Sequence, residues 1–219
     1  MSFVAPAGSR RGLVDWTELI VKDHGFLRIY WHNEHEIAPD MWRSNQPSPN
    51  RIKKAADRGI RTVINLRGPR ADGGWRLEAE ACAKYGLILM DFTARSRAAP
   101  DKQMLHAARA LFEEIELPAM MHCKSGADRA GLMAALYLLI AKKQSAREAV
   151  KQLTWKYGHV KQAKTGVLDA FFASYFPYED RGMGFFDWVD RVYDPASITR
   201  EFEAKEWAVR LTDSILRRE

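Results

Sequence analysis

Short apolar runs alternate with amphipathic stretches along this chain, and the alternation predicts its elements. Runs rich in apolar and β-branched residues, without a helical period, are typical of buried strands. Three such strands are predicted, at residues 60–66, 87–92 and 118–123. The aromatic-rich segment 13–45 predicts further short strands around a turn near His32 and Asn33.

Between and after these strands, apolar positions recur with a helical period. Helices are predicted at 51–58, 78–85, 101–115, 129–143 and 145–158, from Thr165 to Pro177, and from 197 to about 217. Segment 129–143 is apolar on all sides, which is typical of a central buried helix. The alternation of strands and helices predicts an α/β fold with a central mixed, largely parallel sheet flanked by helices, followed by extra C-terminal helices.

Composition places the chain among ordinary globular proteins. Its 219 residues, 47% of them hydrophobic, suit one globular domain of generous size, or one domain with an extension. Two cysteines are too few for a disulfide scaffold, and no Cys/His spacing suggests a zinc site. The N-terminal segment lacks the apolar core of a signal peptide, and the longest apolar stretch, 132–141, is shorter than the ~20 residues that span a bilayer. We therefore expect a soluble, cytoplasmic protein.

The chain is basic, with a formal net charge of +6 and a pI near 9.3. This balance favours anionic partners without choosing among phosphates, lipids and nucleic acids. The sequence has no Arg/Lys block, no zinc-finger spacing and no RNA-binding aromatic motif. We therefore expect no nucleic-acid partner.

The segment HCKSGADRAG, residues 122–131, joins the third predicted strand to the buried helix. Ligands of α/β folds bind at such carboxyl ends of strands. Gly126 permits a tight turn whose backbone N–H groups form a nest for an anion, and the helix N-terminus adds positive potential. Arg129 brings a planar fork that can hold two phosphate oxygens. The same field, with Lys124, favours the thiolate of Cys123.

His-Cys-x5-Arg at a strand-to-helix turn resembles the signature loop of the cysteine-based protein tyrosine phosphatase superfamily. The segments MWRSNQPSP (41–49) and TVINLRG (62–68) resemble the upstream motifs of its compact dual-specificity branch. The resemblance covers roughly residues 25–180 and implies a phosphatase domain there. Residues 1–24 are then an N-terminal extension, and residues 181–219 a C-terminal helical extension packed on the domain.

The resemblance implies a phosphomonoester hydrolase that needs no metal and no cofactor. Cys123 attacks phosphorus to give a phosphocysteine, Arg129 and the loop amides stabilise the transferring group, and water then releases phosphate. The expected substrate-binding residues are Lys124, Ser125, Gly126 and Ala127 of the loop, together with Arg95 and Arg97. His122 is expected to pack beneath the loop and to orient Cys123.

Two aspartates are candidates for the general acid that protonates the leaving group. Asp91 lies 32 residues before Cys123, where dual-specificity phosphatases place the acid, although it can equally be a strand-end residue satisfied by backbone amides. Asp128 directly precedes Arg129, as in myotubularins, Sac-type phosphoinositide phosphatases and some bacterial tyrosine and lipid phosphatases. In myotubularins this aspartate is the acid, and its alternative role is to hold the loop. Both stay open, with Asp91 first.

Ala130 departs from the superfamily pattern, in which Ser or Thr stabilises the departing thiolate of the second step. The lack of a hydroxyl at position 130 predicts slower hydrolysis of the phosphocysteine. This lack also supports an alternative from another class, a phosphate-binding pseudophosphatase. A sulfur-transferring rhodanese-like protein also uses a loop cysteine, but Arg129 and the 41–49 motif favour phosphate.

The Asp-Arg pair and the surrounding arginines favour a lipid-linked or otherwise non-protein phosphate, such as a phosphoinositide or glycolipid headgroup. A protein phosphotyrosine or dual-specificity substrate is the alternative within the same chemistry. A lipid substrate would bring peripheral contact with a membrane. His159, Lys161 and Lys164 form a basic loop that is expected to be a solvated face. The oligomeric state is not predicted.

Overall fold

A five-stranded sheet forms the centre of the computed structural model, which describes residues 14, 15, 17 and 33–216. The strands are β1 (His35–Ala38), β2 (Met41–Asn45), β3 (Thr62–Asn65), β4 (Ile88–Asp91) and β5 (Ala119–Cys123). Their order is β1-β2-β5-β3-β4; β1 is antiparallel to β2, and the other four strands are parallel. The predicted mixed, largely parallel sheet is confirmed.

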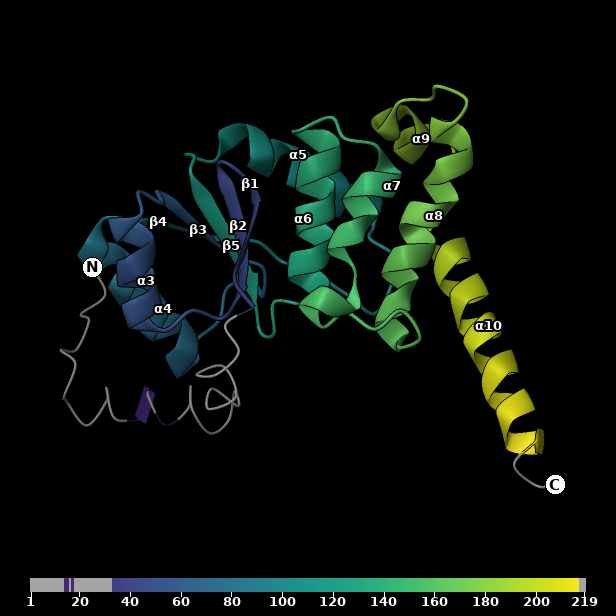
Figure 1. Ribbon diagram of the computed structural model, residues 1–219, viewed down its shortest axis with the longest axis horizontal. Coiled ribbons are helices and arrows are strands. Elements are labelled where there is room, and N and C mark those ends of the chain that lie inside the picture. Colours follow the sequence, from purple (N-terminus) through teal and green to yellow (C-terminus); the bar gives the residue numbers. More distant parts are fainter. Residues whose placement is uncertain (1–13, 16, 18–32, 217–219) are drawn as a thin grey trace.

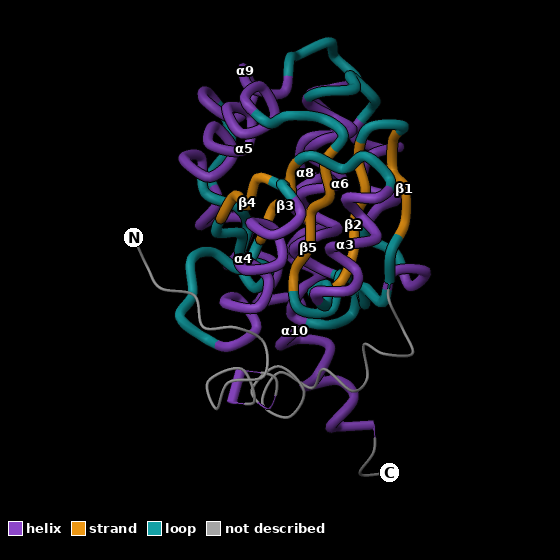
Figure 2. Tube along the Cα trace, turned by 90° about the vertical axis from the view of Figure 1, so that its left-hand side faces the viewer, coloured by secondary structure: helices purple, strands orange, loops and turns teal. Residues whose placement is uncertain are grey.

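Helices cover both faces of the sheet (Figures 1 and 2). One face carries α3 (Pro49–Asp57) and α4 (Gly73–Tyr85); the other carries α5 (Lys102–Glu114), α6 (Asp128–Ile140), α7 (Ala146–Ala149) and α8 (Val167–Glu179). Along β5, Met120 packs in the α3/α4 cluster, whereas Met121 and Cys123 pack in the larger α5/α6/α8 cluster. Burial on both faces explains why the central strands β3 and β5, which are buried at every position, come from apolar runs, whereas the edge strand β4 is partly exposed.

Helix α6 is the centre of the larger cluster, as its composition predicts. Every residue from Ala130 to Ile140 is buried. The helix begins five residues after Cys123 and directs its N-terminus toward the carboxyl end of β5. The strand-to-helix loop thus lies at the edge of the sheet where ligands bind in α/β folds.

The prediction of one continuous helix over 145–158 is wrong. The chain forms only the four-residue α7, capped by Ser145, and then the 3-10 turns η2 (Val150–Gln152) and η3 (Trp155–Tyr157). Gly158 ends this segment in the left-handed region at φ 80°. Tertiary contacts override helix propensity here: the turns place Tyr157 against Asn33 and Arg43, and His159 against Asp128.

The boundaries of α8 also differ from the prediction. The 3-10 turn η4 (Lys164–Gly166) precedes it, so Gly166, and not Thr165, is its N-cap. Pro177 lies inside the helix, which ends at Glu179. A proline so close to the end removes one backbone hydrogen bond, and its φ still fits a helix.

Residues after 180 add two helices, α9 (Phe185–Arg191) and α10 (Pro195–Leu216), of which the sequence predicted only the second. Trp188 and Val189 of α9 are buried in the larger core cluster. Phe202 packs α10 against the same cluster, and the helix then extends away from the body (Figure 1). The division of the chain at residue 180 stays a prediction.

At the other end, most of segment 13–32 lies outside the described residues. Within 13–45, the described residues 14, 15 and 17 are helical, and residues 35–45 form β1 and β2, joined by a turn at Pro39 and Asp40. The segment before the turn predicted near His32 and Asn33 lies outside the described residues. Among the helices of the described residues, none has the length and apolar character needed to cross a bilayer.

Candidate active site

Cys123 is the last residue of β5, and it is buried with 2% of its surface exposed. Its Sγ accepts a hydrogen bond of 3.2 Å from the backbone N–H of Gly126. The loop therefore curls back over the sulfur, and an N–H donor stabilises negative charge on it.

The four loop carbonyls that follow Cys123 all bond to groups outside the loop. Gln46 N donates to Lys124 O at 3.4 Å, Asn33 Nδ2 to Ser125 O at 2.9 Å, and Arg43 Nη2 to Gly126 O at 2.6 Å and to Ala127 O at 2.9 Å. The peptide group is planar and trans, so each N–H points opposite to the carbonyl of the preceding residue. The N–H groups of residues 125–128 consequently face away from these donors and line a nest suited to an anion.

Arg43 of β2 is the main tether of this loop. Its side chain is fully buried, donates to Gln152 O at 2.6 Å, and lies 4.1 Å from the centre of the Tyr157 ring. Burial lowers the pKa of Arg43 to about 10, against the opposing charges of Cys123, Tyr157 and Asp128, and the side chain remains a cation at neutral pH. Sequence reasoning quoted the 41–49 motif but assigned no role to this arginine.

Gly126 is required by both conformation and space. Its φ is +76°, in the left-handed region that favours glycine. A Cβ here would lie 2.8 Å from Asn45 N and 2.9 Å from Asn33 Nδ2. The predicted tight turn at Gly126 is therefore present.

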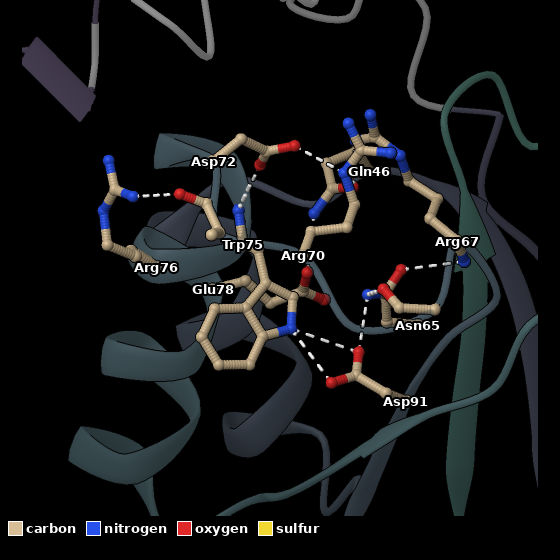
Figure 3. A network of polar contacts seen from close by, with 11 residues as sticks. Gln46, Asn65, Arg67, Arg70, Asp72, Trp75, Arg76, Glu78 and Asp91 are labelled. Atoms are coloured by element: carbon tan, nitrogen blue, oxygen red, sulfur yellow. Dashed lines mark hydrogen bonds and ion pairs between the residues drawn. The ribbon is translucent and has the colours of Figure 1, made fainter. Parts of the chain in front are cut away.

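A buried polar chain lies on the α4 side of the loop. His122 Nε2 contacts Glu78 Oε1, and both side chains are completely buried. Gln46 Nε2 donates to Glu78 Oε2 at 2.6 Å, and Arg67 Nη1 donates to Gln46 Oε1 at 2.9 Å. Figure 3 shows Glu78, Gln46 and Arg67 together at this side of the sheet. His122 thus sits beneath the loop, but sequence reasoning did not find its partner Glu78.

Asp91 ends β4 at the same edge of the sheet, and it is exposed. Its Oδ1 accepts a hydrogen bond of 2.7 Å from Asn65 Nδ2. The Trp75 indole nitrogen lies 3.1 Å from each of the two carboxylate oxygens and donates to them (Figure 3). Asn65 of β3 is in register with both Asp91 and His122. The backbone of Asp91 therefore lies two strands from that of His122 on β5, a distance of about 10 Å across the sheet.

Asp128, the other candidate acid, is engaged by a buried histidine. His159 Nδ1 lies 2.8 Å from Asp128 Oδ1, and His159 Nε2 lies 2.8 Å from Asp169 Oδ2. His159 is 2% exposed, so the prediction that it belongs to a solvated face is wrong. Burial disfavours its charged form, but the hydrogen bonds and charges of the two carboxylates raise the pKa of His159 to about 9.

The remaining predicted residues lie on two sides of the site. Lys124 and Arg129 are half-buried, Ser125 is exposed, and Ala130 is buried in the core cluster that contains Cys123. Arg95 lines a cavity of ≈ 740 Å³ between the loop after β4, α5 and α10. Arg97 lines a smaller cavity, of ≈ 240 Å³, with residues of α10. The two arginines therefore face the C-terminal helix.

No group of three or more His, Cys, Asp or Glu side chains within the described part of the chain could hold a metal ion. In the His159 cluster, both ring nitrogens already face carboxylates.

A buried cysteine at a strand end, an amide nest and a nearby arginine are the features of a cysteine-based phosphatase site. Residues 27–167 match the family described as "DSP-PTPase phosphatase fused to NAD+ Kinase", and the chain belongs to this family. It is accordingly a cysteine-dependent phosphatase of the protein tyrosine phosphatase superfamily, with a dual-specificity-like fold.

Solved structures share this fold. Pseudomonas aeruginosa TpbA has a TM-score of 0.53 at 20% identity, covering 65% of this chain and 84% of that one. A Cys-to-Ser variant of TpbA in complex with phosphotyrosine has a TM-score of 0.51 at 18% identity, covering 65% and 89%. A putative phosphatase (DUF442) from Shewanella putrefaciens CN-32 has a TM-score of 0.50 at 15% identity, covering 67% and 95%. No curated protein sequence matches the chain.

Proposed function

We propose that the protein hydrolyses a phosphomonoester through a phosphocysteine on Cys123, with Arg129 and the loop amides holding the phosphoryl group. The observation that carries this proposal is the outward tethering of the four carbonyls of residues 124–127. It turns the N–H groups of the nest toward the Cys123 sulfur, to which Gly126 N–H already donates, and on this side they can donate to the equatorial oxygens of a phosphoryl group.

The proposed reaction has two steps. The Cys123 thiolate attacks phosphorus, the S–P bond forms as the P–O bond to the leaving group breaks, and the acid donates a proton to that oxygen. Water then attacks phosphorus and loses its proton to the same carboxylate. The S–P bond breaks, phosphate leaves and the thiolate is regenerated. Ala130 offers no hydroxyl to this thiolate, so the second step is expected to be the slower one.

Asp91 is the proposed acid. A general acid must reach the leaving group, and the Asp128 carboxylate instead points to the buried His159 ring, 2.8 Å away, whose raised pKa of about 9 keeps that ring cationic at neutral pH. Asp91 is exposed at the carboxyl edge of the sheet, where a leaving group can reach it.

A lipid-linked phosphate is the proposed substrate class. Trp155 is 78% exposed, and it lies two residues from Tyr157, whose carbonyl shares the Asn33 amide with the loop residue Ser125. Exposed Lys156 follows Trp155. An exposed indole beside cations is typical of contact with an anionic membrane surface. Protein phosphotyrosine remains the second candidate, because a variant of TpbA, which shares the fold, binds phosphotyrosine.

Phosphate release by the wild type and by Cys123→Ser tests the proposal, with phosphoinositides, glycolipid phosphates and phosphotyrosine peptides side by side. We expect turnover that Cys123→Ser abolishes, and the highest rate on a lipid phosphate. Cys82→Ala is the matched control, because Cys82 is buried in the α3/α4 cluster, and it should retain activity. Phosphate binding without turnover on any substrate would instead support the pseudophosphatase.

A further inference from the structure

His159 lies between two carboxylates, one from the catalytic loop and one from α8. The distance from His159 Nδ1 to Asp128 Oδ1 is 2.8 Å, and the distance from His159 Nε2 to Asp169 Oδ2 is also 2.8 Å. The imidazole is completely buried, whereas the carboxylate side chains of Asp128 and Asp169 are 28% and 12% exposed. We call these three residues the charge cluster.

The geometry defines the state of the imidazole. A carboxylate only accepts hydrogen bonds, so a ring that faces one carboxylate from each nitrogen must donate from both, and it is then a cation. The raised pKa of His159, about 9, agrees with this state. The cation cancels one of the two carboxylate charges in the cluster.

The negative charge of Asp128 is unfavourable in a site that binds phosphate. Asp128 is the first residue of α6 and directly precedes Arg129, so its charge lies beside the amide nest. An uncompensated carboxylate there would repel a phosphate dianion and compete with it for the Arg129 guanidinium. Instead, the Asp128 side chain points to His159.

We propose that His159 is a positioning residue that holds the Asp128 carboxylate away from the phosphate nest and cancels its charge, so that Arg129 stays available to the substrate. Asp169 fixes the ring from the opposite side. The inference rests on the proposed function of the loop, and it adds a role for residues that the sequence motif does not contain.

Binding of inorganic phosphate to four proteins tests this role: wild type, His159→Gln, Asp128→Asn and the double variant. Glutamine keeps an amide donor but removes the charge. We expect His159→Gln to weaken phosphate binding about tenfold, because one unscreened carboxylate then faces the anion. The double variant should regain most of that loss, because it lacks the carboxylate that needs cancelling.

This recovery distinguishes positioning from a role in folding, since a second substitution in a damaged core does not restore binding. His106→Gln is the matched control: its Nε2 lies 2.7 Å from Asp190 Oδ1, in a pair between α5 and α9, and the variant should bind phosphate like the wild type.

Two results would overturn the proposal: wild-type affinity in His159→Gln, or a double variant as weak as the single one. Nitrogen-15 NMR of the histidine rings gives a readout without ligand, and a neutral His159 ring at pH 7 would also overturn it. If the wild type binds no phosphate although the ring is cationic, the proposed function fails, and this role of His159 fails with it.

Discussion

Two buried histidines flank the catalytic loop, and they are held in different ways. His122, on the α4 side, contacts one carboxylate, Glu78, which belongs to a chain of polar groups that continues through Gln46. His159, on the α8 side, lies between two carboxylates. The first site fixes the strand that carries Cys123, whereas the second compensates charge beside the nest. His122 therefore stabilises the conformation of the loop, and His159 compensates charge beside it.

The His122 side should be the more sensitive to losing its carboxylate. Glu78→Ala leaves His122 and Gln46 without their buried partner, and we expect the free energy of unfolding to fall by about 3–5 kcal/mol. Urea denaturation followed by circular dichroism measures this change. Glu78→Gln, which keeps the shape, should cost less. Equal costs for the two variants would mean that the carboxylate charge of Glu78, and not the shape of its side chain, accounts for the loss.

The His159 side should make stability depend on pH. Its folded pKa, about 9, lies above the ordinary value of 6.5, so the folded state binds the extra proton between these limits. This contribution is complete below about pH 6.5 and is lost as pH rises through about 9, by about 1–3 kcal/mol. Denaturation midpoints from pH 6 to 10 should show the decline. His159→Gln should flatten that decline, and an unchanged slope would show that another group titrates.

A third histidine sharpens the comparison from outside the site. His106 also pairs with a carboxylate, Asp190, but the two side chains are 36% and 54% exposed. Solvent screens such pairs, so His106→Gln should change the free energy of unfolding by about 0.5 kcal/mol or less. A larger loss would mean that the packing of α9 on α5 depends on this pair.

The sequence predicts the parts of this molecule that are local. Cys123, Gly126 and Arg129 lie within seven residues, and the apolar runs around them define a strand and a buried helix. The structure contains both, with the loop between them. The segment after α7 was predicted wrongly, because its carbonyls bond to the distant side chains of Arg43 and Asn33, which its own propensity does not register.

The supports of the loop could not be predicted, because their partners are distant in sequence. Arg43 reaches the Gly126 carbonyl over 83 residues, and Asn33 reaches the Ser125 carbonyl over 92. A motif names the residues that face the ligand, but no spacing rule names the residues that hold its backbone. The available signal for Arg43 was its place in the 41–49 motif, in the middle of a predicted strand region.

The tethered carbonyls also bear on the entropy of binding. Ordering the backbone of one residue costs about 1–2 kcal/mol of conformational entropy. In a flexible loop, this cost would reduce the free energy of each binding event. In this protein Arg43, Asn33 and the Gln46 amide fix the peptide planes before any ligand binds. The loss of freedom thus belongs to folding. Affinity for phosphate is then governed by charge and dehydration, with little contribution from rearrangement of the chain.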